Sequence, residues 1–168
     1  MTRGDAESSV TDVIRRAVPA DAAALVVLRA AMYEAMGEDT FGPEAPWRAD
    51  AAAWFDRELR RTREVAAFVA DVPGAGVVAS ALGLIEHPVP SPANPAGERG
   101  HVSQVSTLPA HRHRGYARGC LVALLDWYGR DTLATRIDLN ATGDGEPLYR
   151  SLGFAPSPYA ALRLRLHR

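Results

Sequence analysis

The sequence predicts one α/β domain whose elements follow the order β-α-α-β-β-β-α-β-α-β. Short apolar runs with a two-residue period alternate with longer runs that repeat every 3.6 residues, and these are the signals of strands and helices. Glycines and prolines separate the runs. A length of 168 residues fits one domain with a full hydrophobic core. We therefore expect one domain over residues 13–168, preceded by a flexible polar tail over residues 1–12.

Each element follows from its own pattern. Asp21 can cap a first helix whose apolar face carries Leu25, Leu28, Met32 and Met36 and which ends near Gly37. Gly153 is typical of a residue that ends the last helix. Leucine and arginine alternate in the final segment, as in a half-exposed strand. The expected strands are 13–18, 64–71, 77–86, 101–108, 136–141 and 159–166, and the later helices are 48–61, 114–129 and 145–152.

Composition excludes several classes of function. The net charge is −1, whereas a nucleic-acid-binding protein usually carries a basic excess. All nineteen basic residues are arginine, so no lysine exists for a phosphate-binding P-loop or a Schiff base. Cys120 is the single cysteine, which fits a reducing cytoplasm. No apolar run approaches the length of a membrane span, and residues 1–12 lack a signal-peptide core. We therefore expect a cytoplasmic protein without nucleic-acid or membrane partners.

The segment from Arg112 to Ala117 is the strongest functional signal in the chain. It joins a predicted strand to a predicted helix, so unpaired backbone N–H groups and the positive end of the helix dipole meet there. Gly115 allows close approach of a ligand, and no acidic residue occurs between Arg99 and Leu125. These features favour a pyrophosphate site. The alternative is a polar turn whose arginines are solvated.

The spacing Arg-x-x-Gly-x-Ala in this loop resembles the acyl-CoA signature of the GNAT family of N-acetyltransferases. Further segments are similar to the same family, and together the resemblance extends from Val13 to Leu166. It implies a mixed, mostly antiparallel central sheet flanked by helices. The similar segments are Ile14–Ala17 with Pro19–Asp21, Ser106–Pro109 before the loop, and Leu148–Phe154 with its Leu-Tyr-x-x-x-Gly-Phe pattern.

The resemblance implies an enzyme that transfers an acetyl group from acetyl-CoA to the primary amine of a small molecule. The amine would attack the thioester directly in a ternary complex. Two alternatives stay open: a peptide or protein N-acetyltransferase, and a catalytically silent module that binds acyl-CoA or another ligand. A homodimer is among the assemblies that the family analogy suggests.

The resemblance also assigns roles to residues of this chain. The backbone of Val105, Ser106 and Thr107 would bind the pantetheine amides, and Asn140 would bind pantetheine or else form a turn. Tyr149 would protonate the leaving thiolate and touch the cofactor, its alternative being a packed aromatic. The pyrophosphate would bind to Arg112, His113, Arg114, Gly115, Tyr116, Ala117 and Arg118.

The general base is left open, because the strand before the loop holds no acidic residue. The candidates are Glu86, His101 and, on the first helix, Glu34. We expect Cys120 to be a core residue rather than a nucleophile. No metal is expected, since His111 and His113 have no thiolate or carboxylate beside them.

The acceptor is open as well. The loop after the first helix contains Glu38, Asp39, Glu44 and Trp47. An acidic, aromatic groove there would suit a cationic amine. An ordinary exposed charged loop is the alternative.

Overall fold

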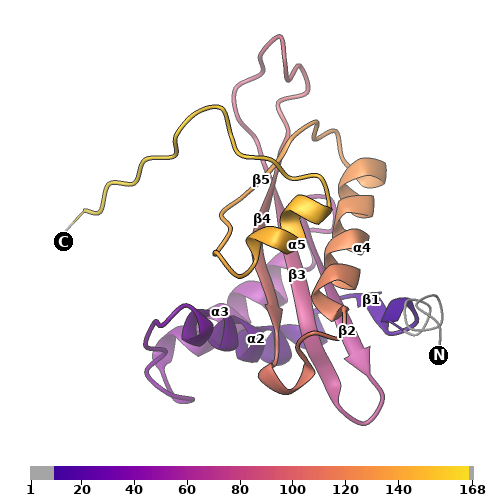
Figure 1. The fold of residues 1–168 in the computed structure, drawn as a ribbon, viewed down its shortest axis with the longest axis vertical. Helices are drawn as coiled ribbons and strands as arrows, with labels where there is room; N and C mark the ends of the chain where they lie inside the picture. Colours follow the sequence, from indigo (N-terminus) through magenta and orange to yellow (C-terminus); the bar gives the residue numbers. More distant parts are fainter. Residues whose placement is uncertain (1–9, 167–168) are drawn as a thin grey trace.

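The computed structural model describes residues 10–166 and shows a central sheet with helices on both faces (Figure 1). Five strands lie in the order β1-β2-β3-β4-β5. Helices α4 and α5 pack on one face, and α2 and α3 on the other. The strands are β1 (Ile14–Arg16), β2 (Val65–Val72), β3 (Gly76–Glu86), β4 (Arg99–Thr107) and β5 (Ile137–Leu139). The helices are α2 (Ala22–Ala35), α3 (Pro46–Glu58), α4 (Tyr116–Asp131) and α5 (Glu146–Ser151), with 3-10 turns η1 (Pro19–Asp21) and η2 (Pro109–His111).

The sheet is antiparallel from β1 to β4, and only the last pair, β4 with β5, is parallel. This mixed, mostly antiparallel sheet confirms the fold class expected from the sequence. Alternation along β2 divides its side chains between two cores. Val65, Ala67 and Val69 pack with α2 and α3, whereas Ala66 and Ala70 pack beneath α4. None of the helices within residues 10–166 is long and apolar enough to cross a membrane.

The pairing of β3 with β4 slips by one residue in mid-strand. Leu82 pairs with Gln104 but Gly83 pairs with Val102, so Ser103 is an extra residue that forms a β-bulge. Tyr128 of α4 supports the sheet next to this bulge. Its hydroxyl lies 3.0 Å from the carbonyl oxygens of Leu84 and of His101, to which it donates.

Small residues make room for the Tyr128 side chain. A Cβ atom on Gly83 would lie 2.5 Å from the Tyr128 hydroxyl oxygen, and one on Gly100 would lie 2.7 Å from its ring. Both distances are far below van der Waals contact. Burial raises the pKa of Tyr128, so the phenol keeps its proton and remains a donor. The two glycines therefore allow a buried hydroxyl to reach the β3 and β4 backbones.

The final strand expected from the sequence is wrong. Residues 159–166 form no strand, and Leu162, Leu164 and Leu166 are all exposed. The segment extends away from the domain (Figure 1). A two-residue alternation can stabilise a strand only where a neighbouring strand takes up its backbone hydrogen bonds, and this segment lies against none of the described strands.

The expected cap of the first helix also needs correction. Asp21 precedes α2 but makes no side-chain cap hydrogen bond to it. Its carboxylate instead accepts two hydrogen bonds from Arg15, both at 2.8 Å, and one from the Val18 N–H. The Arg15 hydrogen bonds lower the pKa of Asp21 and outweigh its burial. Asp21 therefore joins β1 to the start of α2.

The structure also bears on the expected flexible tail over residues 1–12. Residues 1–9 of that tail lie outside the described residues, and Val10 and Thr11 are helical.

We predict that Gly83→Ala lowers the free energy of unfolding by about 1–3 kcal/mol, because the new methyl group would displace the Tyr128 hydroxyl and Leu124. Gly129→Ala is the matched control. Gly129 lies exposed in α4 with open space around its Cα, so alanine should be neutral or stabilising by about 0.5–1 kcal/mol. Urea unfolding followed by circular dichroism measures both. Equal stability of Gly83→Ala and wild type would contradict this role of Tyr128.

Candidate functional site

The loop before α4 has the backbone geometry of an anion site. Gly115 adopts φ +87°, a left-handed conformation that glycine reaches without strain, and His113 has φ +61°. The first helical hydrogen bond of α4 is donated by the Gly119 N–H to the Gly115 carbonyl oxygen, at 2.9 Å. The preceding N–H groups of α4 therefore have no helical acceptor and point toward the loop. The positive end of the helix dipole lies at the same place.

The arginines of this loop differ from the eight described arginines that pair with carboxylates. Arg112, Arg114 and Arg118 have no carboxylate partner within residues 10–166. Carboxylates pair instead with Arg15, Arg57, Arg60, Arg61, Arg99, Arg130, Arg136 and Arg150. Arg112 Nε donates to the Thr107 carbonyl oxygen at 3.3 Å, and Arg118 donates to Ser151 Oγ at 2.7 Å. The loop thus keeps uncompensated positive charge for an anionic ligand.

Strands β4 and β5 stay paired over a short distance only. β5 pairs with Gly100, His101 and Val102, and no strand among the described residues pairs with β4 beyond that point on this side. The Leu108 N–H donates to Val78 of β3, so alternation turns the backbone groups of Val105 and Thr107 away from β3. These groups face the open edge of β4, where an extended ligand can bind them.

Ser106 is placed differently from its two neighbours. It pairs with Ser80, so its backbone faces β3, and its buried hydroxyl donates to the Leu28 carbonyl oxygen of α2 at 2.8 Å. Of the three β4 residues expected to bind pantetheine, the structure therefore turns Val105 and Thr107 toward the open edge and uses Ser106 to attach α2 to the sheet.

Tyr149 lies on α5, and the turn that ends this short helix brings Phe154 against the Tyr149 ring. The Gly153 N–H donates to the Arg150 carbonyl oxygen and the Phe154 N–H to that of Tyr149, both at 3.1 Å. Gly153 has φ +93°, so it ends the helix as its sequence predicts. The Phe154 ring packs edge-on against Tyr149 with centroids 6.0 Å apart. Burial raises the pKa of Tyr149, which keeps its phenol protonated at neutral pH.

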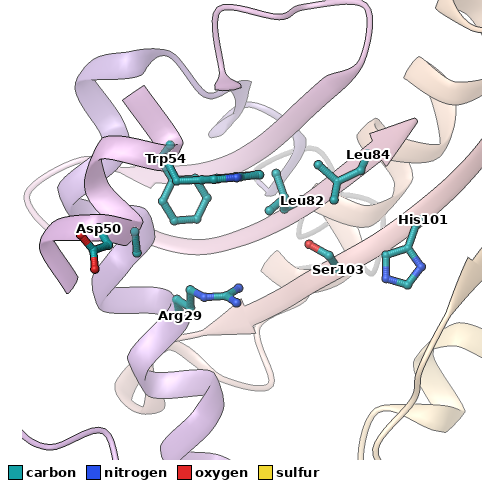
Figure 2. Close-up of a pocket in the computed structure, with 9 residues that line it drawn as sticks. Arg29, Asp50, Trp54, Leu82, Leu84, His101 and Ser103 are labelled. Atoms are coloured by element: carbon teal, nitrogen blue, oxygen red, sulfur yellow. The ribbon is translucent and has the colours of Figure 1, made fainter. Parts of the chain in front are cut away.

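A cavity of about 500 Å³ opens on the other face of the sheet, beneath α2 and α3 (Figure 2). Its walls are mainly apolar and come from β3 and α3. The polar groups are few: Arg29 of α2, Asp50 of α3, and His101 and Ser103 of β4. The remaining lining residues are Ala51, Trp54, Phe55, Leu82 and Leu84. A concave apolar site with a few polar groups is typical of small-ligand binding.

The candidate bases fall in different places. His101 lines the cavity. Glu86 accepts hydrogen bonds from Arg99 at 2.9 and 2.5 Å and lies outside this cavity, in a second, smaller depression. Glu34 accepts a hydrogen bond from Thr40 at 2.9 Å and does not line the cavity either. Asn140 follows β5 and is exposed, with no side-chain partner among the described residues.

Sequence reasoning missed most of the cavity. The acidic loop residues Glu38, Asp39 and Glu44 are exposed and do not line it, and Trp47 donates to the Thr40 carbonyl oxygen at 3.0 Å. The cavity instead uses Arg29 and Trp54. A helix pattern places both near the apolar face but cannot show that two helices leave a space between them. Ser103 lines the cavity because of the bulge, for which the sequence carries no signal.

The remaining reactive side chains have structural positions. Cys120 is fully buried under β2 and β3, and desolvation raises the pKa of its thiol to about 12, so the thiolate is scarce at neutral pH. This confirms its expected place in the core. His113 lies in the loop, and His111 Nδ1 is buried without a hydrogen-bond partner among residues 10–166. No group of three metal-ligating residues occurs in this part of the chain.

Solved structures share this fold. A predicted acetyltransferase from Clostridium acetobutylicum, whose structure includes acetyl-CoA, is 22% identical with a TM-score of 0.76 over 89% of this chain and 94% of its own. A GCN5-related N-acetyltransferase from Ralstonia eutropha JMP134 is 22% identical, with a TM-score of 0.72 over 90% and 97%. A ribosomal-protein-alanine N-acetyltransferase from Brucella melitensis biovar Abortus 2308 is 21% identical, with a TM-score of 0.65 over 92% and 98%.

No curated protein sequence matches this chain. The family model for the acetyltransferase (GNAT) family, however, matches residues 29–154. The matched range includes the cavity residues, the basic loop and Tyr149. The chain therefore belongs to the GNAT acetyltransferase family, whose members transfer an acetyl group from acetyl-CoA.

Proposed function

We propose that the protein N-acetylates the primary amine of a small molecule by direct attack on acetyl-CoA in a ternary complex. The observation that carries this proposal is the position of the apolar cavity beside β4, at the point where the pairing of that strand with β5 ends. His101 and Ser103 line the cavity, and Val105 and Thr107 continue the same strand toward the basic loop. An acceptor in the cavity and a cofactor along β4 would thus lie beside the same strand.

The loop and strand suit the two ends of acetyl-CoA. The free N–H groups at the start of α4, with Arg112, Arg114 and Arg118 around them, would hold the pyrophosphate. The outward backbone groups of Val105 and Thr107 would bind the pantetheine amides, with Asn140 on the facing segment. Acetyl-CoA supplies the activated thioester, and the protein's own groups orient it and move protons.

We propose that two side chains of the chain move those protons. Tyr149 keeps its proton at neutral pH and would give it to the thiolate sulfur as the C–S bond breaks. An amine acceptor must lose a proton, and we assign its removal to His101 rather than Glu86. His101 lines the cavity, whereas the Glu86 carboxylate is occupied by Arg99. Histidine is the side chain that most often acts as a general base.

Arg114→Glu should weaken acetyl-CoA binding about 10- to 100-fold, because it replaces a cation beside the pyrophosphate site with an anion. Arg130→Glu makes the same charge change at the other end of α4, where Arg130 lies 3.8 Å from Asp126, and should bind normally. Isothermal titration calorimetry measures both affinities. Equal binding by wild type and Arg114→Glu would remove the loop from the site, and no binding by wild type would overturn the proposed function.

Tyr149→Phe should lower kcat by about 10²–10⁴-fold with little change in the KM for acetyl-CoA, since the phenol donates only as the thiolate leaves. Release of free thiol from acetyl-CoA in the presence of an acceptor amine measures the rate. Tyr159→Phe is the control, because Tyr159 is exposed in the C-terminal segment. An unchanged kcat under conditions where chemistry limits the rate would exclude Tyr149 as the acid.

His101→Ala should lower kcat/KM and shift the acidic limb of its pH profile to higher pH, because the amine would then have to lose its proton to water. His87→Ala is the control, since His87 lies at the exposed end of β3 and outside the cavity. The measurement is kcat/KM between pH 5 and 9 for the two variants. An identical acidic limb in wild type and His101→Ala would show that another group takes the proton.

A further inference from the structure

Arg29 is the one arginine among the described residues that line the acceptor cavity, and its charge is uncompensated. No carboxylate within residues 10–166 forms an ion pair with it. The other charged lining residue, Asp50, is exposed on α3. Figure 2 shows Asp50 at the outer end of the cavity, whereas the Arg29 guanidinium extends toward Ser103. A half-buried cation among apolar walls therefore lacks its counterion.

The Arg29 side chain is held in place from two sides. Its Nη1 donates to Gln104 Oε1 at 3.3 Å, and its Nη2 donates to the Tyr33 hydroxyl at 2.8 Å while the guanidinium stacks on the Tyr33 ring. Gln104 is itself buried and bonds the Leu25 carbonyl oxygen and Ser80 Oγ. These contacts use two of the five guanidinium N–H groups, and the described residues accept none of the other three. The free donors are thus oriented before any ligand binds.

We propose that the acceptor is an apolar primary amine that also bears a carboxylate, and that Arg29 binds this carboxylate. This inference rests on the proposed function, because it names the class of amine that would use the same cavity. A guanidinium fork matches a carboxylate geometrically, and its attraction is strengthened where water is excluded. A dianionic phosphate fits less well, since one arginine supplies a single positive charge and Asp50 adds a negative one at the rim.

The other cavity walls orient the rest of the acceptor. Trp54, Leu82 and Leu84 form the apolar surface against which a hydrocarbon or aromatic body packs. His101 and Ser103 lie at the opposite end of the cavity from Asp50 (Figure 2). With the carboxylate on Arg29, the amine lies toward His101 and the open edge of β4. Amino acids with large apolar side chains have this combination of groups.

The test compares matched acceptors that differ in the carboxylate alone: phenylalanine with 2-phenylethylamine, and leucine with 3-methylbutylamine. Each is titrated calorimetrically into the full-length protein, with and without saturating CoA, and assayed for acetyl transfer. Wild type should bind the carboxylate-bearing member of each pair at least about 10-fold more tightly. Arg29→Met should remove that preference. Arg29→Lys keeps the positive charge but lacks the paired guanidinium donors, so it should retain part of the preference.

Arg48→Met is the matched control. Arg48 also stacks on an aromatic ring, that of Trp47 at 5.0 Å, but does not line the cavity, so the preference should persist. Circular dichroism and acetyl-CoA titration of each variant show that fold and cofactor site are intact. The inference is overturned if neither carboxylate-bearing acceptor binds, if the plain amines bind equally well, or if the preference survives in Arg29→Met. Normal acetyl-CoA binding with transfer to plain amines as efficient as to their carboxylate-bearing partners would overturn this inference alone, whereas absent acetyl-CoA binding would overturn the proposed function.

Discussion

The register slip between β3 and β4 is the constraint on which the site depends. It inserts Ser103 into β4 and lets both Ser103 and Gln104 serve the face beneath α2 and α3, where strict alternation would send one of them to the other face. Ser103 then lines the cavity while Gln104 holds Arg29. Tyr128 supports the strands at this point by donating to backbone carbonyl oxygens of both, and it can do so only because Gly83 and Gly100 lack side chains.

Strands β4 and β5 also stop pairing in this region. The parallel pair extends over Gly100 to Val102 and ends where the bulge begins. Beyond it, Val105 and Thr107 present backbone groups that no strand among the described residues takes up. The paired part of β4 borders the acceptor cavity, and the unpaired part leads to the basic loop before α4. In the proposed function, this one strand would connect the acceptor cavity to the cofactor site, and the end of its pairing with β5 would leave its edge open to the cofactor.

The arginines of this lysine-free chain differ in their partners. Eight of those within residues 10–166 lie beside carboxylates and contribute to stability in modest, solvent-screened pairs. Arg29 in the cavity and the arginines of the loop have no such partner among the described residues, and their neighbours are neutral groups: an amide, hydroxyls and a backbone carbonyl oxygen. Neutral partners fix the position of a guanidinium without cancelling its charge. The charges of Arg29 and of the loop arginines are thus available to the anionic groups proposed to bind there.

The sequence alone determined the features that depend on local chemistry. Hydrophobic periodicity identified the elements through α5. The Gly115 loop and the Gly153 helix end were readable because each needs a particular residue at a particular backbone angle. Only the tertiary structure decided the features that depend on which segments meet. It showed that residues 159–166 lie against none of the described strands, that Asp21 bonds Arg15 rather than capping α2, and that the cavity uses Arg29 and Trp54 rather than the acidic loop. A bulge, a cavity or an unpaired cation arises from contacts between residues far apart in the chain, and no local pattern records such contacts.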